Sequence, residues 1–255
     1  MPPSARKDHV YAVGVHKAPP QLSKKEFEDK VNAMMDEALA FPVVKRNIVK
    51  LEIMFHNDRL DDHLKFLEFP HAEPTAIVMV QSETLDHLIE AVRDPEVQNL
   101  FDRAKEFCLQ CSTSAFCVDV VPKSNWDSSD SSTSRDAHAI GIYKAPRNLS
   151  AEDYTKKMHA LLDAWVGLSG IQKHGAKYEL WLPNNAVFED FRALGLSMAE
   201  PFYFIHGESE TLEQMMEDMK DAEAQKLVIA ANNEFGLSVD SCLFAVDVVA
   251  KIGKS

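Results

Sequence analysis

Apolar residues along the chain follow two different spacings that alternate with one another. Short stretches rich in Val, Ile and Phe, at residues 9–17, 76–80 and 116–121, predict β-strands. Within residues 51–55, apolar side chains recur at every second position and predict a further strand. The segments in between carry apolar residues every three or four positions, which predicts helices; in the first segment they are Phe27, Val31, Met34, Met35 and Leu39. The predicted order is strand, helix, strand, strand, helix, strand.

The same pattern returns in the second half of the chain with many of the same residues. Residues 12–19 read Ala-Val-Gly-Val-His-Lys-Ala-Pro, and residues 139–146, which lie 127 positions later, read Ala-Ile-Gly-Ile-Tyr-Lys-Ala-Pro. Residues 116–121 return as residues 244–249, 128 positions later. A near-constant offset over half a chain indicates two copies of one domain. We expect residues kept in both copies to hold the fold, and residues that differ to carry any function unique to one copy.

The repeat divides the chain into two domains and a connection. We predict a first domain over residues 1–123, a linker over 124–136, which is Ser-rich and lacks apolar periodicity, and a second domain over 137–255. The order β-α-β-β-α-β is that of the ferredoxin-like unit, an antiparallel sheet with both helices on one face. Both faces of the predicted strands are apolar, so the uncovered face of each sheet needs a partner. The predicted fold class is α+β, with two tandem ferredoxin-like βαββαβ domains packing sheet-to-sheet as an intramolecular α+β barrel.

Composition and charge limit the choice of partners. Hydrophobic residues make up 45% of the 255 residues and charged residues 26%, which is enough apolar material for two packed domains. The net charge of −13, without a cluster of Lys or Arg, disfavours nucleic acid and anionic membranes as partners. The sequence has no apolar run long enough to span a bilayer, and its first residues lack the apolar core of a signal peptide. We therefore expect a cytoplasmic protein.

The sequence lacks the motifs that typically bind metals and cofactors. Cys108 and Cys111 form the one CxxC pair, without a second pair of ligands, so we interpret them as structural or incidental thiols and leave a redox role open. Residues 58–63, Asp-Arg-Leu-Asp-Asp-His, match no metal-binding loop and are interpreted as a solvated segment. Neither a Gly-rich nucleotide loop nor a GxSxG elbow is present. We expect neither a metal nor a cofactor.

Several short segments of both copies match one protein family in order and spacing. In the first copy these segments are residues 22–27, 41–47, 94–100 and 116–122, and in the second copy residues 149–154, 169–174 and 221–227. With these segments the chain resembles the dimeric α+β barrel superfamily and, within it, the EthD-like branch, over most of both copies. Most members build the barrel from two chains, so the resemblance implies a tandem fused pseudo-dimer. It leaves open whether two such molecules form a further homodimer.

The resemblance does not imply one particular reaction. Relatives include polyketide cyclases, cofactor-free monooxygenases, muconolactone isomerases, haem enzymes and stress-induced proteins, and a shared fold does not decide among them. Related cyclases place a catalytic His at the position of Val97 or Ala224, and EthD-like sequences often place another near Met35 or Leu162. These apolar residues cannot move a proton, which weakens a direct transfer of the cyclase mechanism to this chain.

Polar residues inside the predicted strands are the remaining candidates for chemistry. Asp119 and Asp247 occupy equivalent mid-strand positions, where a carboxylate either points to solvent or bonds to a loop, or instead orients a catalytic His. His9 and His138 open the first strand of each copy. Each is either an ordinary, partly exposed residue or one member of a His/Asp pair for general acid–base catalysis.

Three positions of the second copy differ from the first copy in a way that adds chemistry. The pairs, first copy first, are His16 and Tyr143, Met79 and His206, and Met54 and Trp181. His206 lies in an apolar strand, where it is either a core residue with one hydrogen bond or a base. Tyr143 lies on a neighbouring strand of this fold, so the two side chains would together polarise a carbonyl and remove an acidic proton. Trp165, Trp181 and Phe204 suggest an aromatic-lined cavity for a flat apolar ligand.

Two functions fit this sequence. The first is a cofactor-independent enzyme that acts by acid–base proton transfer on a small aromatic, polyketide-like or other hydrophobic carbonyl compound, as a cyclase, isomerase or lyase. In this hypothesis His206 or His138 is the base. Tyr143 hydrogen-bonds the carbonyl, and Asp247 orients the His. The residues expected to contact the substrate are Trp181, Phe204, Trp165, Asp119 and His9. The alternative is a non-catalytic stress-response or hydrophobic-ligand-binding barrel.

Overall fold

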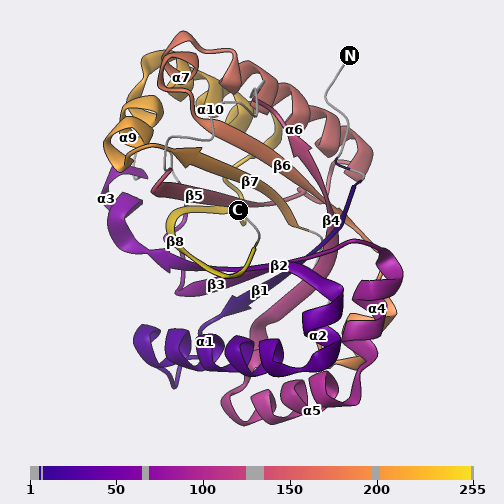
Figure 1. Ribbon diagram of the computed structural model, residues 1–255. Helices are drawn as coiled ribbons and strands as arrows, with labels where there is room; N and C mark the ends of the chain where they lie inside the picture. Colours follow the sequence, from indigo (N-terminus) through magenta and orange to yellow (C-terminus); the bar gives the residue numbers. More distant parts are fainter. Residues whose placement is uncertain (1–5, 7, 65–68, 125–134, 197–201, 254–255) are drawn as a thin grey trace.

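The strands of the chain close into one antiparallel barrel (Figure 1). The fold is described from a computed structural model, which covers residues 6, 8–64, 69–124, 135–196 and 202–253. The strands are β1 (Val10–Lys17), β2 (Ile48–Asn57), β3 (Thr75–Ser82), β4 (Thr113–Pro122), β5 (Ala137–Lys144), β6 (Lys177–Asn184), β7 (Phe202–Ser209) and β8 (Cys242–Ile252). Around the barrel they follow the order β1-β3-β2-β8-β5-β7-β6-β4, and β4 pairs with β1 to close the ring.

Most of the helices lie outside the barrel, in one group over each half (Figure 1). The first group is α1 (Lys24–Ala40), α2 (Pro42–Asn47), α4 (Leu85–Arg93) and α5 (Pro95–Ala104), and the second is α6 (Ala151–Val166), α7 (Ser169–His174), α9 (Leu212–Lys220) and α10 (Ala222–Phe235). Short helices in the connections are η1 (Asp58–Leu60), α3 (Asp61–Leu64), η3 (Lys105–Phe107), η4 (Leu109–Ser112) and α8 (Phe188–Ala193). Within the described ranges, none of these helices has the length and apolar character that crossing a bilayer requires.

Each half of the chain contributes four neighbouring strands to the barrel. The first half gives the order β4-β1-β3-β2 and the second half gives β8-β5-β7-β6. The two sheets join at their edges, where β2 pairs with β8 and β4 pairs with β6, and their inner faces meet across the barrel interior. The predicted α+β barrel of two βαββαβ units is confirmed. The domain bounds 1–123 and 137–255 stay predictions, and most of the predicted linker 124–136, residues 125–134, lies outside the described residues.

The alternation of side chains along each strand builds three apolar cores. Tyr11, Val13 and Val15 of β1 point into the barrel interior, where they join Phe116, Phe204 and Phe244. The residues in between point outward, so that Ala12 packs with Phe27 of α1. In the second half, the outward residues of β5 and β7 pack in the same way beneath α6 and α9. Both strand faces are buried for this reason, as their apolar sequences predict.

The connections after β2 and β6 cross over and interlock the two halves. Leu60 and Leu64, which follow β2 in the first half, are buried in the core of the second half. Val187 and Phe191, which follow β6 in the second half, are buried in the core of the first. The halves are therefore held together by core packing as well as by strand pairing.

The two mid-strand aspartates lie on the outer face of the barrel, at the seams between the halves. Asn57 of β2 donates a hydrogen bond through Nδ2 to Asp247 Oδ1 on β8, at 2.9 Å. Asn184 of β6 donates the equivalent bond to Asp119 Oδ1 on β4, at 3.0 Å. Arg59 also bonds to Asp247. Both carboxylates are exposed, so the predicted role of Asp247 in orienting a histidine of the interior is wrong, and the solvent-facing alternative is correct.

One glycine in each half makes room for a ring two residues further along the strand. A Cβ atom at Gly14 would lie 2.7 Å from His16 Nε2, and one at Gly141 would lie 2.3 Å from the Tyr143 hydroxyl oxygen. His16 and Tyr143 therefore lie back over the strand, beneath the helices of their own half. This close approach explains why the Gly-Val-His and Gly-Ile-Tyr segments occupy equivalent positions.

Candidate functional site

A polar cavity of about 220 Å³ lies at one end of the barrel, where β1, β2, β5 and β6 begin. Nearly all of its lining residues come as equivalent pairs from the two halves. The pairs, first half first, are Tyr11 and His138, Lys50 and Lys177, Glu52 and Glu179, Met54 and Trp181, Met79 and His206, Gln81 and Glu208, and Val120 and Val248; Arg6 completes the lining. The cavity therefore lies where the halves meet, and both halves build it from the same positions.

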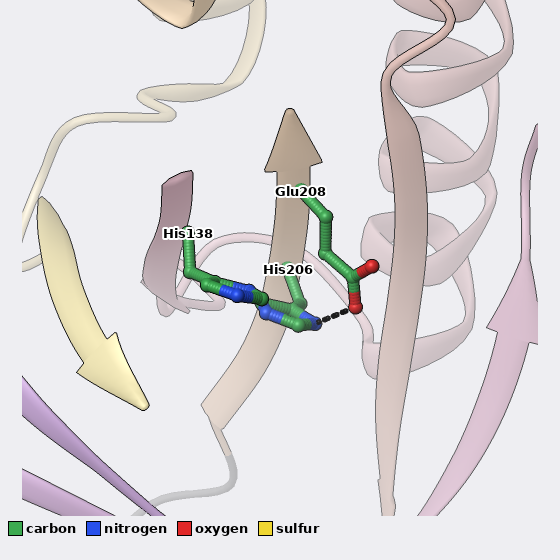
Figure 2. A group of neighbouring side chains, drawn as sticks. All are labelled: His138, His206 and Glu208. Atoms are coloured by element: carbon green, nitrogen blue, oxygen red, sulfur yellow. Dashed lines mark ion pairs between the residues drawn. The ribbon is translucent and has the colours of Figure 1, made fainter. Parts of the chain in front are cut away.

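Three adjacent lining positions carry titratable groups in the second half and different residues in the first. His138 on β5 and His206 and Glu208 on β7 point into the same space from neighbouring strands (Figure 2). The two imidazole rings are nearly parallel, at an angle of 7°, with their centres 5.7 Å apart. Glu208 Oε1 lies 3.9 Å from His206 Nδ1. The three groups offer ligand atoms within 4.8 Å of one another, so they can share a proton, a ligand or an ion.

His206 is buried and has one ring nitrogen without a partner. Only 5% of the residue is exposed, and its Nε2 atom makes no hydrogen bond within the described residues. Its ring lies 5.4 Å from the ring of Trp181, which is fully buried. A buried polar atom without a partner is uncommon in a folded protein and calls for an explanation. We interpret this nitrogen as one that meets a ligand.

The charges around the cavity are balanced and mostly paired. Arg6 lies 2.8 Å from Glu179, and Lys50 lies 2.8 Å from Glu52. The indole nitrogen of Trp181 donates to Glu179 Oε2 at 3.1 Å, which fixes both side chains. The rim of the cavity is thus charged, whereas its floor is formed by Trp181 and other apolar side chains, Met54, Met79, Val120 and Val248.

Burial sets the protonation of two groups that face the cavity. Burial, together with the nearby charge of His206, lowers the pKa of His138 although Glu208 and Glu52 favour its charged form. His138 is therefore neutral at neutral pH and can accept a proton. Burial raises the pKa of Tyr11 against the influence of the neighbouring Arg6, so the Tyr11 hydroxyl keeps its proton and can donate a hydrogen bond.

Tyr143 does not meet His206, contrary to the expected pair. Ile140 is paired with His206 across β5 and β7, and Tyr143, three residues further along, points to the other face of the sheet. It lies in an apolar cavity of about 70 Å³ beneath the helices of the second half, together with Trp165. Burial raises the pKa of Tyr143 far above its ordinary value. The predicted scheme in which Tyr143 and His206 act on one substrate is therefore wrong.

The other predicted site residues divide between the cavity and the rest of the molecule. Trp181 lines the cavity, and Phe204 lies beneath it with its ring centre 5.7 Å from that of Trp181. Trp165 lies on α6 in the apolar cavity, and Asp119 lies at the outer seam, so these two do not meet His206. His9 precedes β1 and lies 2.9 Å from Asp8, outside the cavity lining.

Sequence reasoning missed several residues of this site. Glu208 carries the clearest signal, because it lies two positions after His206 on the same strand face and replaces Gln81. Tyr11 is the counterpart of His138, and its position could have been found from the repeat. Lys50, Lys177, Glu52 and Glu179 are kept in both halves and have the appearance of solvated strand ends.

A second apolar cavity, of about 120 Å³, lies beneath the helices of the first half. His16 lies against it, where Tyr143 lies in the second half. His16 Nδ1 is 2.8 Å from Thr113 Oγ1, and burial lowers the pKa of His16 to about 4. Since Thr113 Oγ1 donates to the Leu109 carbonyl oxygen, it accepts a hydrogen bond from the Nδ1–H group of neutral His16. This histidine is a satisfied core residue.

Comparison with known proteins relates the chain to others through its fold. The sequence matches no family model and no curated protein. Among solved structures, an anthrone oxidase-like protein is similar with a TM-score of 0.59 at 10% identity, over 96% of this chain and 93% of the other. A proposed monooxygenase of Fusobacterium nucleatum is similar with a TM-score of 0.54 at 6% identity, over 96% of both chains. A proposed monooxygenase of Lactobacillus acidophilus is similar with a TM-score of 0.50 at 6% identity, again over 96% of both. The EthD-like branch stays a prediction. These likenesses support the fold, a closed antiparallel α+β barrel, and carry no reaction over to this chain.

Proposed function

We propose that this protein is an enzyme that moves a proton on a small carbonyl compound bound in the cavity at the end of the barrel. The observation that carries the proposal is His206, which lines this cavity beside His138 and Glu208 and has a buried Nε2 atom without a partner within the described residues. The reaction class is isomerisation, cyclisation or cleavage beside a carbonyl. The fold, which solved structures named as monooxygenases and as an anthrone oxidase-like protein share, is in keeping with a small-molecule site.

His206 acts as the base in this proposal. Glu208 lies 3.9 Å from Nδ1, a distance that one water molecule or a small rotation of the glutamate spans. A proton held at Nδ1 on the glutamate side leaves the lone pair of Nε2 free to accept a proton from the substrate. The neighbouring His138 is neutral, so it does not repel the positive charge that forms on the His206 ring when it takes up the proton.

The proposed step breaks a C–H bond beside the carbonyl. Its proton goes to His206 Nε2 and its electron pair moves toward the carbonyl, which becomes an enolate. Tyr11 is the proposed donor to the enolate oxygen, because it lines the same cavity and keeps its proton. Return of the proton to another carbon completes an isomerisation. For a cyclisation, the enolate carbon attacks a second carbonyl of the same molecule, and the alkoxide that forms takes the proton back from His206. Neither outcome needs an oxidant.

The cavity fits a small substrate with one apolar and one polar end. Its volume of about 220 Å³ is below that of most drug-sized sites. Trp181 and the two methionines of the floor suit an apolar or aromatic body, and the charged rim suits a carbonyl or carboxylate group. A short keto acid or an aryl ketone meets these conditions.

The experiment is proton exchange in heavy water. The protein is incubated with a panel of keto acids and aryl ketones, and the loss of the signal of the proton beside the carbonyl is followed by NMR. We expect exchange with the wild-type protein, a loss of at least tenfold in His206→Met, and a smaller loss in Glu208→Gln. Tyr143→Phe is the matched control, because Tyr143 faces the opposite side of the sheet. Exchange that survives His206→Met, or that is lost in Tyr143→Phe, would refute the proposal.

The alternative function, binding of a hydrophobic ligand without catalysis, has its own supporting observation. Apolar cavities of about 120 Å³ and 70 Å³ lie beneath the helices of the two halves, away from His206. Binding of a fluorescent apolar probe tests it. Under this alternative, Ala139→Trp, which fills the cavity of the second half, reduces probe binding, while His206→Met leaves it unchanged.

A further inference from the structure

We infer that His56, Asp58 and Asp61, with His71 beside them, bind a divalent first-row transition metal ion at the other end of the barrel. This inference is independent of the proposed reaction. His56 is near the end of β2, Asp58 begins η1, and Asp61 begins α3, the short helix that follows β2 in Figure 1. Lys50 and Glu52, at the start of β2, belong to the cavity described above. The two sites are therefore at opposite ends of the same strand.

His56 is buried without a hydrogen bond to either ring nitrogen. The residue is 3% exposed, and both Nδ1 and Nε2 lack a partner within the described residues. Its ring packs edge-on against Phe244 of the barrel interior, with the ring centres 4.8 Å apart. An apolar residue would fill this place at lower cost, because a buried polar group is stable only when it is bonded. The imidazole is therefore explained by a ligand that this arrangement accepts.

The two aspartates lie at the distance from His56 that a shared ion requires. His56 Nε2 is 3.7 Å from Asp61 Oδ1 and 3.8 Å from Asp58 Oδ1, and the three atoms lie within 4.8 Å of one another. These separations are too long for hydrogen bonds. Ligand atoms bound to one zinc ion at about 2.0–2.2 Å lie about 3.4 Å apart in tetrahedral geometry, so the distance from the nitrogen to each oxygen has to shorten by only a few tenths of an ångström to fit one ion.

The turn that presents the ligands is held in place by packing and by a side-chain bond. Leu60, between the two aspartates, is fully buried in the core of the second half. Asn57 Oδ1 accepts a hydrogen bond from the Arg59 amide at 3.2 Å, and this bond fixes the start of the turn. His71 Nδ1 lies 3.2 Å from Asp61 Oδ2, where it orients the carboxylate or supplies a fourth ligand. A rigid frame of this kind lowers the cost of gathering the ligands.

The equivalent turn of the second half shows that the fold does not need these residues. Asn184 Oδ1 accepts from the Ala186 amide at 3.1 Å, as Asn57 does from Arg59, so the two turns correspond residue by residue. At the positions of His56, Asp58 and Asp61 the second half has Pro183, Asn185 and Phe188. The first half therefore has a set of ligands that its counterpart lacks in the same backbone.

The types of ligand atom favour one class of metal ion, and a neighbouring lysine competes with that ion for one carboxylate. A buried imidazole with carboxylates suits zinc, cobalt, nickel, manganese or ferrous iron better than calcium or magnesium, which prefer oxygen alone. Lys24 Nζ lies 3.2 Å from Asp58 Oδ1 and occupies one carboxylate oxygen. A bound ion has to displace this ammonium group. Removal of the Lys24 charge is therefore expected to tighten binding.

The test is a titration of the metal-stripped full chain with Co²⁺, followed by its visible absorption, and with Zn²⁺ as competitor. We expect one saturable site per chain, a loss of affinity of at least tenfold in Asp61→Asn and in His56→Gln, and a gain of several-fold in Lys24→Gln. Asp61 has a side chain that is 20% exposed, and Asn has the same shape, so its variant keeps the fold even if the His56 variant does not, and circular dichroism checks both.

Two histidines elsewhere serve as controls. His87 on α4 has its Nδ1 atom 3.9 Å from Glu83 Oε2, a similar pairing that belongs to no larger ligand group among the described residues, and His87→Gln should leave binding unchanged. His206→Met should also leave it unchanged. Absence of a stoichiometric site, wild-type affinity in Asp61→Asn, or loss of binding in His206→Met would overturn the inference, the last because it would assign the ion to the other end of the barrel.

Discussion

Replacement of His206 by Met is expected to stabilise the protein while it removes the proposed base. Met is the residue that the first half has at the equivalent position 79, where it is 6% exposed in the same barrel interior. His206 is 5% exposed, and its Nε2 is buried without a partner. Leaving such a group unbonded costs about 1–3 kcal/mol of folding free energy. Met has a similar length and no group that needs a hydrogen bond.

The gain is reduced by the ring contacts that the imidazole makes. The His206 ring lies 5.4 Å from the ring of Trp181 and 5.7 Å from that of His138. Contacts of this kind are worth about 0.5–1.5 kcal/mol per pair, and the thioether of Met recovers about 0.3–1.5 kcal/mol against the Trp181 ring, so the net effect is a stabilisation of up to about 1 kcal/mol. Urea unfolding at pH 7, followed by tryptophan fluorescence, measures it as a higher midpoint with an unchanged slope.

The reciprocal change, Met79→His, is the matched control for this prediction. It places an imidazole at the equivalent position of the first half, where Tyr11 and Gln81 replace His138 and Glu208. We expect it to destabilise the protein by about 1–3 kcal/mol, the cost of an unbonded buried group. A His206→Met protein that is less stable than the wild type by 1 kcal/mol or more would refute the reasoning, because it would mean that the imidazole makes a net favourable interaction.

Two further predictions concern residues that we assign to the fold. Burial lowers the pKa of His16 from 6.5 to about 4. Between these two pH values His16 is protonated in the unfolded chain and neutral in the folded chain. Stability should therefore be complete above pH 6.5 and fall by up to about 3 kcal/mol on acidification toward pH 4. Urea unfolding across this range tests it, and His16→Tyr should flatten the profile; parallel profiles would contradict the assignment. Asp119→Ala should lower the free energy of unfolding by about 1 kcal/mol or less and leave proton exchange unchanged, because its carboxylate bonds to Asn184 at the seam. Loss of exchange in that variant would contradict the structural role.

The fold could be predicted from the sequence because the repeat and the strand pattern carry the same information. Strands that are apolar on both faces, such as residues 76–80, require cover on both sides. Helices cover one face and the other half of the chain covers the other. The predicted sheet packing is accurate in outline, but the sequence did not reveal the edge pairing of β2 with β8 and of β4 with β6. Edge pairing depends on the relative position of the halves, which no local pattern encodes.

The site could be predicted only in part, because side-chain direction depends on register between strands. Alternation within one strand gives the relative direction of His206 and Phe204 correctly. Whether Tyr143 on the next strand points to the same face depends on how β5 and β7 are aligned, and a shift of one residue reverses the answer. The alignment pairs Ile140 with His206, so Tyr143 faces the helices. Knowing that two strands are neighbours was therefore not enough to place two side chains in one cavity.

The comparison of the two halves is itself evidence about which residues hold the fold and which carry chemistry. Asp119 and Asp247 are the same residue type at equivalent positions. Each accepts a hydrogen bond from an Asn of the other half, and the two bonds hold the two seams of the barrel. His138, His206 and Glu208 are replaced in the first half by residues of other types. These are Tyr11, Met79 and Gln81, and they line the same cavity. A cavity formed by identical halves would bind a substrate equally well in two opposite orientations. The three substitutions lie together on β5 and β7, on one side of the cavity, so in the proposed function they would form a single acid–base wall and select one orientation of the substrate.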